Sequence, residues 1–127
     1  MAANNNQNNN ANNNNKRTLV YMDQVNPTLF EFDTDTELHA WNREVHEIKD
    51  EIEAINNACI AGTTTQDQQK PNYIAWVQRV KRFVNSVGEK HVPNDIKYAL
   101  NDTERGVGLQ VTQWQHPFDP TRYANYY

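Results

Sequence analysis

The nearest approach to a catalytic or metal-binding pattern in this sequence is a histidine and an aspartate four residues apart. His46 and Asp50 bound the run His-Glu-Ile-Lys-Asp. On a helix this spacing puts both side chains on one face, where they could share a metal ion. A stable site needs further ligands, and no second pair of this kind stands out. We therefore expect a solvated helix face, and we predict no metal, no cofactor and no small-molecule substrate.

The single cysteine, Cys59, could act as a nucleophile with a histidine as its base. It falls on the apolar stripe of a predicted helix, however, and a thiol buried among apolar groups is unreactive. We predict that the protein is not an enzyme. One cysteine cannot form an internal disulfide, which favours a reducing compartment. The candidate bases are the four histidines, His39, His46, His91 and His116.

Five basic residues could contact phosphate groups. Lys16 and Arg17 close the N-terminal tail, and Arg79, Lys81 and Arg82 form a patch on a predicted helix. Phosphate contacts in nucleic-acid binding are built from lysine and arginine. The net charge of −4, however, argues against a chain that coats nucleic acid by bulk charge. The alternative interpretation of the patch is a solvated face that pairs with an acidic helix, so nucleic-acid binding is the second hypothesis.

Residues 114–127 form an arm rich in aromatic rings. Two prolines exclude regular structure there, and so many rings cannot all be buried in a small core. Exposed aromatic clusters are typical of contact surfaces between proteins. We expect this arm to dock on another copy of the chain, and the alternative is a strap on its own domain. The predicted interface residues are Trp114, Phe118, Tyr123, Tyr126 and Tyr127.

Two long helices are predicted to position these groups. From Leu38 to Cys59 the apolar residues recur at alternating spacings of three and four, which predicts a helix over residues 34–62. Thr34 and Glu37 form the pattern of a capping box at its start. A polar loop over 62–70 follows, and Pro71 is expected to begin a second helix that ends at Gly88.

Charge supports the pairing of these helices as an antiparallel hairpin. Residues 35–59 hold seven acidic and two basic residues, a net charge of −5, whereas residues 70–90 hold five basic and one acidic, a net charge of +4. A short connection between helices also favours an antiparallel pair. We expect Trp41 and Trp76, one on each apolar face, to be at least half-buried.

The remaining segments are shorter. Residues 18–22 and 28–32 are β-prone runs that could pair as a hairpin or lie extended over the helices, and we expect the second arrangement. A third helix of at most two turns is expected around 96–100, then a turn over 101–108 and a strand over 107–114. Residues 1–15 hold ten asparagines, a composition typical of a disordered tail.

Together these patterns predict a mainly α fold: an antiparallel helical hairpin, a short third helix, extended N- and C-terminal arms and at most a minor β element. The predicted divisions are an Asn-rich low-complexity tail (1–17), a small helical domain (18–113) and the aromatic arm (114–127). We expect a non-enzymatic structural subunit of a homo-oligomeric assembly, such as a virion coat, capsid-associated or filament subunit. The alternative is a nucleocapsid-like protein that binds nucleic acid. The expected partners are other copies or other subunits and no membrane, in the cytoplasm or in a virion.

Overall fold

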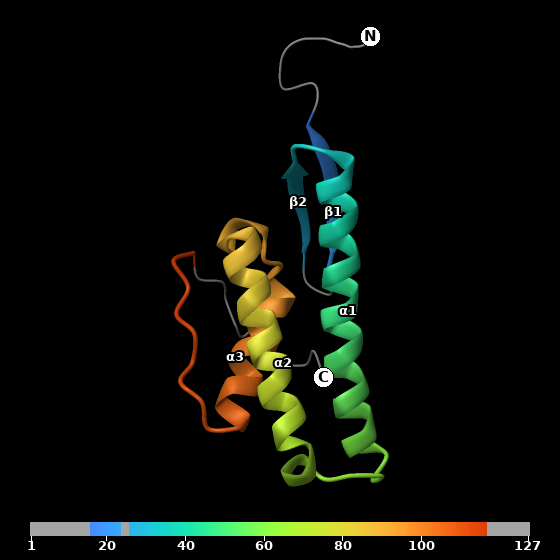
Figure 1. Ribbon diagram of the computed structural model, residues 1–127, viewed down its shortest axis with the longest axis vertical. Coiled ribbons are helices and arrows are strands. Elements are labelled where there is room, and N and C mark those ends of the chain that lie inside the picture. Colours follow the sequence, from blue (N-terminus) through green and yellow to red (C-terminus); the bar gives the residue numbers. More distant parts are fainter. Residues whose placement is uncertain (1–15, 24–25, 117–127) are drawn as a thin grey trace.

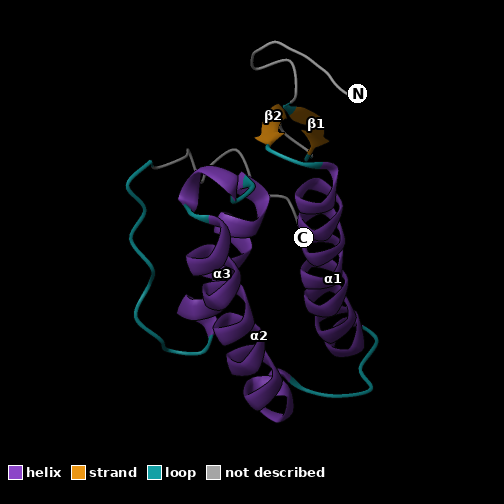
Figure 2. Ribbon diagram, turned by 45° about the horizontal axis from the view of Figure 1, so that its top comes forward, coloured by secondary structure: helices purple, strands orange, loops and turns teal. Residues whose placement is uncertain are grey.

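A computed structural model describes residues 16–23 and 26–116 of the chain as three α-helices and a small sheet. Helices α1 and α2 run antiparallel, α3 packs beside α2, and the strands cover the N-terminal end of α1 (Figures 1 and 2). The mainly α prediction with a minor β element is confirmed. The elements are β1 (Arg17–Met22), β2 (Pro27–Phe32), α1 (Asp35–Ile60), α2 (Gln66–Val87), the 3-10 helix η3 (Glu89–His91) and α3 (Asn94–Gly106).

Helix α1 forms where the apolar periodicity predicted it. Its N-cap is Thr34, whose hydroxyl accepts a hydrogen bond from the backbone N–H of Glu37 at 3.1 Å. Gly62, just past the end of the helix, has a φ of +79°, a backbone conformation that favours glycine. Cys59 departs from the prediction, because it is only partly buried. The buried stripe consists of Trp41, Val45, Ile48, Ile52 and Ile55.

Helix α2 begins five residues before the predicted start at Pro71. Thr65 and Gln68 form a full capping box: the Thr65 hydroxyl accepts from the Gln68 N–H at 3.1 Å, and the Gln68 side chain accepts from the Thr65 N–H at 3.0 Å. These two bonds satisfy backbone donors that a helix start leaves free. Pro71 therefore lies inside the helix, where its missing N–H removes one intrahelical bond.

Three side chains of α2, those of Tyr73, Trp76 and Arg79, bond to α1. Tyr73 of α2 donates to the Asn56 side chain at 2.8 Å, while Arg79, further along α2, reaches back to Glu47 at 2.7 Å. Trp76 is fully buried between the two helices and donates its indole N–H to the carbonyl of Ile48 at 2.9 Å. Trp41 is also buried, which confirms the expectation for both tryptophans.

The β-prone runs pair with each other, so the expectation that they lie separately over the helices is wrong. β1 and β2 are antiparallel, with Leu19 opposite Phe30 and Tyr21 opposite Thr28. The inner face of this hairpin rests on Trp41. The ring centroids of Tyr21, Phe30 and Phe32 lie 5.9, 4.9 and 5.3 Å from that of Trp41. Helix α1 thus supplies the apolar surface that an isolated two-stranded hairpin lacks.

Helix α3 is longer than predicted, and the strand expected after it does not form. α3 spans 13 residues. Thr103 and Glu104, which were expected in a turn, are buried residues of this helix. Residues 107–116 run back along α3 without regular secondary structure (Figure 1). We refer to residues 107–116 as the strap. The Asn-rich segment 1–15 and the final residues 117–127 lie outside the described part of the chain.

Candidate interaction surface

The residues that first suggested chemistry, His46, Asp50 and Cys59, all lie on α1. His46 and Asp50 are exposed on α1, and a ring nitrogen of His46 lies 2.8 Å from the carbonyl oxygen of Asn42. Within residues 16–23 and 26–116, no three His, Cys, Asp or Glu side chains are arranged to hold a metal ion. The Cys59 sulfur lies 3.8 Å from the Tyr73 hydroxyl. Burial and this contact raise the pKa of Tyr73 to about 12.

The two basic residues at the start of the described chain pair with aspartates that follow β2. Lys16 pairs with Asp33, and Arg17 pairs with Asp35 at 2.7 Å. The hydrogen bond between Lys16 and Asp33 raises the pKa of the lysine and lowers that of the aspartate. These side chains are largely exposed, so each pair contributes little to stability. Both basic residues thus already have a carboxylate partner.

Arg79, in the basic patch on α2, is also paired with carboxylates. Arg79 bridges Glu47 and Glu51 of α1, with N–O distances of 2.7 and 3.0 Å. Burial alone would lower the pKa of Arg79, but the two carboxylates hold it above its ordinary value. The helices therefore attract each other as their net charges predicted.

The other two residues of the basic patch, Lys81 and Arg82, differ in whether they have a carboxylate partner. The Lys81 ammonium lies 3.4 Å from the buried carboxylate of Glu104. Arg82 is exposed and joins no ion pair within the described residues. Four of the five basic residues proposed to bind phosphate are thus paired with carboxylates.

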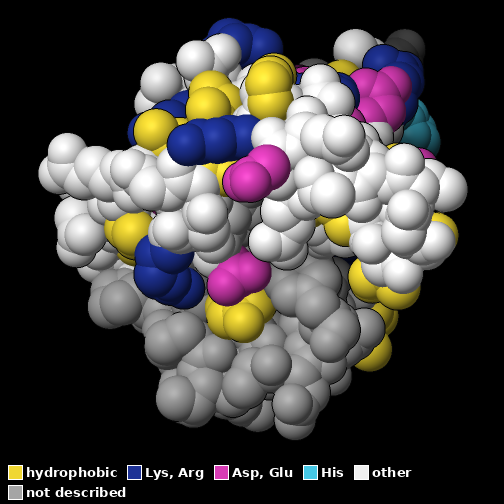
Figure 3. Space-filling view, turned by 90° about the horizontal axis from the view of Figure 1, so that it is seen from below, with side chains coloured by type: hydrophobic (Ala, Val, Ile, Leu, Met, Phe, Trp, Pro, Cys, Tyr) yellow, Lys and Arg dark blue, Asp and Glu magenta, His cyan; other side chains and the backbone are white. Residues whose placement is uncertain are grey.

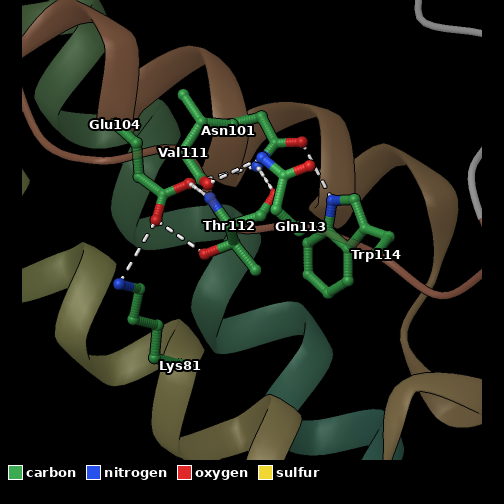
Figure 4. Close-up of polar contacts among 7 residues, drawn as sticks. All are labelled: Lys81, Asn101, Glu104, Val111, Thr112, Gln113 and Trp114. Carbon is green, nitrogen blue, oxygen red and sulfur yellow. Dashed lines mark hydrogen bonds and ion pairs between the residues drawn. The ribbon is translucent and has the colours of Figure 1, made fainter.

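A buried glutamate holds the middle of the strap (Figure 4). Glu104 of α3 is fully buried, and its carboxylate accepts from the Thr112 N–H at 2.9 Å and from the Thr112 hydroxyl at 2.7 Å. Asn101 adds a third donor at 3.0 Å, and Lys81 supplies the positive charge. A buried carboxylate is tolerated only when its oxygens are bonded in this way. Sequence reasoning missed Glu104, because a lone glutamate in a polar run carries no sign of burial.

A second carboxylate holds the end of the strap. Glu89 of η3 accepts from the backbone N–H groups of Gln115 and His116 at 2.9 and 2.6 Å. Lys97, itself buried, lies 3.3 Å from Glu89 and donates to the His116 carbonyl at 3.1 Å. Burial alone would raise the pKa of Glu89, but these donors hold it below its ordinary value.

Trp114 of the expected interface lies against its own chain. Its indole N–H donates to Asn101 at 2.9 Å, and the Lys97 ammonium lies 5.2 Å from the centre of its ring. Trp114 is partly buried, so the first ring of the aromatic arm belongs to the strap. The other four expected interface residues, Phe118, Tyr123, Tyr126 and Tyr127, lie outside the described residues.

Acid is expected to release the end of the strap. Glu89 has a folded-state pKa below its ordinary value of 4.5, so its contribution to stability is complete above pH 4.5. That contribution is lost as the pH falls through the lowered folded-state pKa. The protection of the Gln115 and His116 amides, measured by NMR as the exchange rate relative to the intrinsic rate at the same pH, should therefore fall in acid. In a Glu89→Gln protein this protection should already be low at pH 7.

The matched control is Glu44→Gln, which removes a carboxylate remote from the strap. It should leave the exchange at Gln115 and His116 as in the unmodified protein. Equal protection in the Glu89→Gln protein at pH 7 would show that the carboxylate does not hold the strap.

The outer face of the β-hairpin is the main exposed apolar surface of the described chain. Val20 and Leu29 are direct cross-strand partners, and each is 59% exposed. Met22 follows on the same face and is 65% exposed. The sheet holds two strands, so each has a hydrogen-bonded neighbour on one side only. The sequence signal for this face was the run of successive apolar residues in each strand, because successive strand residues point to opposite faces and only one face can rest on α1.

The opposite end of the molecule differs from the hairpin face. Seen from that end, the coloured hydrophobic side chains form small separate groups among charged and polar ones (Figure 3). In the described part of the chain, no helix has both the length and the apolar character needed to cross a bilayer. The outer face of the hairpin, defined by Val20, Met22 and Leu29, is therefore the candidate interaction surface.

Comparison with known proteins adds no assignment. No protein-family model matches the chain, and no significant match was found among curated proteins or solved structures.

Proposed function

We propose that the protein is a non-enzymatic structural subunit of a homo-oligomeric assembly. The observation that carries this proposal is the apolar outer face of the hairpin. Val20, Met22 and Leu29 gather three large apolar side chains, each at least 59% exposed, on one face of a two-stranded sheet. Single exposed apolar residues are common, but a contiguous group of them marks a contact surface.

A second copy of the chain is the partner that this face fits best. The face is apolar and carries no charge at its centre, so a like surface can cover it without burying an unpaired ion. Within the described sheet each strand has a strand neighbour on one side only, an arrangement to which a strand of another chain can add. If the contact closes on itself it gives a ring or dimer, and if it repeats it gives a filament. A virion coat or filament subunit would use such a contact repeatedly.

Nucleic-acid binding has less support from the geometry. Phosphate contacts need basic side chains that are free to leave their present partners. Arg79 bridges two glutamates, and Lys81 faces a fully buried one. Arg82 alone remains as an exposed patch residue without an ion pair among the described residues. We therefore do not propose it as the function.

The proposal predicts that charge on the outer face of the hairpin blocks assembly. The double variant Val20→Lys, Leu29→Lys places two like charges opposite each other at the centre of the face. Both side chains are exposed, so the fold should be retained, and circular dichroism can check this. Light scattering after size-exclusion chromatography should show the mass falling to that of the 14.8 kDa chain.

The matched control adds the same two charges elsewhere. Gln78→Lys with Asn85→Lys puts lysines at exposed polar positions of α2 and leaves the outer face of the hairpin intact. This control should keep the mass of the unmodified protein. If the Val20 and Leu29 double variant also keeps that mass, the hairpin face is not the contact.

A further inference from the structure

The outer edge of β2 is poorly suited to pairing with a further strand. Pro27, its first residue, has no N–H, and prolines in a sheet occur where that position faces away from the neighbouring strand. Near the other end of β2, a ring N–H of His91 in η3 donates to the carbonyl of Glu31 at 2.8 Å, from outside the sheet. Pro27 and Glu31 are four residues apart, so both direct their backbone groups to the same outer edge. This edge thus lacks one donor and has one acceptor already bonded.

β1 presents the opposite edge of the sheet. Along an antiparallel pair, residues that exchange hydrogen bonds alternate with residues whose N–H and C=O point away from the partner. The β1 residues opposite the outward-facing positions of β2 therefore direct their own backbone groups to the outer edge of β1. They are Thr18, Val20 and Met22. Within residues 16–23 and 26–116, β1 has no strand neighbour other than β2.

This edge is also the one that lies away from the rest of the helical domain. In both ribbon views β2 is on the side of α2 and α3, and β1 is on the side away from them (Figures 1 and 2). An exposed edge whose residues all carry an N–H can accept a strand from another chain.

We propose that β1 of a second copy pairs antiparallel with this edge about a two-fold axis at Val20, which joins two hairpins into one four-stranded sheet. In this register Val20 lies opposite Val20 of the partner subunit, and Thr18 lies opposite Met22 of the partner subunit. All three outward positions then exchange backbone hydrogen bonds, whereas a shift by two residues brings one of them against a residue outside β1. The inference rests on the proposed function, because it names the contact through which copies of the chain assemble.

Charge favours the antiparallel arrangement over a parallel one. In the proposed register Arg17 lies opposite Asp23 of the partner subunit, and the two-fold axis repeats this pair at the other end. The Arg17 side chain is 43% exposed in its ion pair with Asp35, so a second carboxylate can reach it. A parallel pair in register would instead place Arg17 opposite Arg17 of the partner subunit, and like charges directly opposite each other are destabilising.

The same pairing enlarges the apolar outer face. Val20, Met22 and Leu29 of one hairpin become continuous with the same residues of the other, because side chains on one face of a sheet line up across neighbouring strands. A two-stranded sheet is only marginally stable, and additional strands with an apolar face stabilise it. Pairing at the edge therefore makes one large face from two small ones.

Cysteine pairing tests the register in the full-length protein with Cys59→Ser, which removes the only native cysteine. Val20→Cys puts two cysteines opposite each other, with Cα atoms about 5.5 Å apart, within the range of a disulfide. In the matched control, Thr18→Cys, the two cysteines are roughly 13 Å apart along the strands. On mild oxidation, Val20→Cys should give a covalent dimer on a non-reducing gel at least several-fold faster than Thr18→Cys. Equal rates would contradict the antiparallel register.

Proline tests the edge and leaves the apolar face intact. Thr18→Pro removes an outward N–H of β1 and no bond to β2, so circular dichroism should show the fold retained. Its Kd for self-association, from light scattering over a range of concentrations, should rise at least about tenfold, because two symmetry-related hydrogen bonds are lost. The matched control is Glu31→Pro, at the cross-strand position on β2, which should keep the Kd of the unmodified protein.

The outcomes separate this inference from the proposed function. If the Val20→Lys, Leu29→Lys protein is monomeric while Thr18→Pro assembles as its parent does, copies meet through the apolar face alone and edge pairing is wrong. Equal dissociation of Thr18→Pro and Glu31→Pro would also contradict it, because the contact would not be specific to β1. If Thr18→Pro does not fold, the cysteine variants decide: an unmodified protein that assembles, with no faster dimer from Val20→Cys, overturns edge pairing. A monomeric unmodified protein would overturn the proposed function and this inference together.

Discussion

Replacing Trp76 by alanine is expected to lower the free energy of unfolding by about 3–5 kcal/mol, the range for large aromatic residues removed from a core. Trp76 is fully buried between the two long helices, and its indole N–H bonds to the carbonyl of Ile48. The substitution leaves a cavity and an acceptor without its donor. Because domains are stable by only about 5–15 kcal/mol in total, the loss should be plain in urea denaturation followed by circular dichroism.

Two further variants calibrate this result. Trp76→Phe keeps most of the ring volume and removes the N–H, so it should cost clearly less than the alanine variant. Gln78→Ala, at an exposed position of the same helix, should stay within about 0.5 kcal/mol of the unmodified protein. If Trp76→Ala costs no more than Gln78→Ala, the two helices do not pack through Trp76.

The Glu104→Ala variant should destabilise the protein by about 2–4 kcal/mol, through the partners that it leaves unpaired. The carboxylate accepts from Thr112 twice and from Asn101 once in a fully buried position. Lys81 is 48% exposed and can turn to water, so its ion pair supplies only a small part of the loss. The larger part of the loss comes from the backbone N–H of Thr112, which loses its acceptor. The strap then has to open to expose this group to water.

The readout that distinguishes this from general destabilisation is local. Amide exchange at Thr112 should rise more than exchange in the centre of α1. Glu104→Gln keeps an acceptor oxygen and should fall between the alanine variant and the unmodified protein. A Glu104→Ala protein as stable as its parent would mean that the strap does not depend on this carboxylate.

Much of the helical framework could be predicted, because it rests on local rules. The spacing of apolar residues over Leu38–Cys59 located α1, and Thr34 marked its start. The error at α2 was also local: Thr65 and Gln68 show the same capping pattern as Thr34 and Glu37. Pro71 was given more weight, because proline is favoured at the first position of a helix.

The remaining errors have a tertiary cause. Thr103 and Glu104 belong to a polar run that predicts a turn, and only the strap shows why they are buried and helical. The strap was predicted to contain a strand, because its apolar residues partly alternate. That alternation carries no information about the carboxylates that accept hydrogen bonds from the strap backbone. The two short strands likewise depend on Trp41, which lies at least nine residues further along the chain. Such partners are distant in sequence, so no local pattern contains them.

The measurement that tests the central claim most directly is the mass of the unmodified protein in solution, with negative-stain images of the same sample. A structural subunit should show a mass that is a multiple of 14.8 kDa, growing with concentration, and the images should show rings or filaments of uniform width. A mass of 14.8 kDa across the whole concentration range, with no regular particles in the images, would contradict the proposed role.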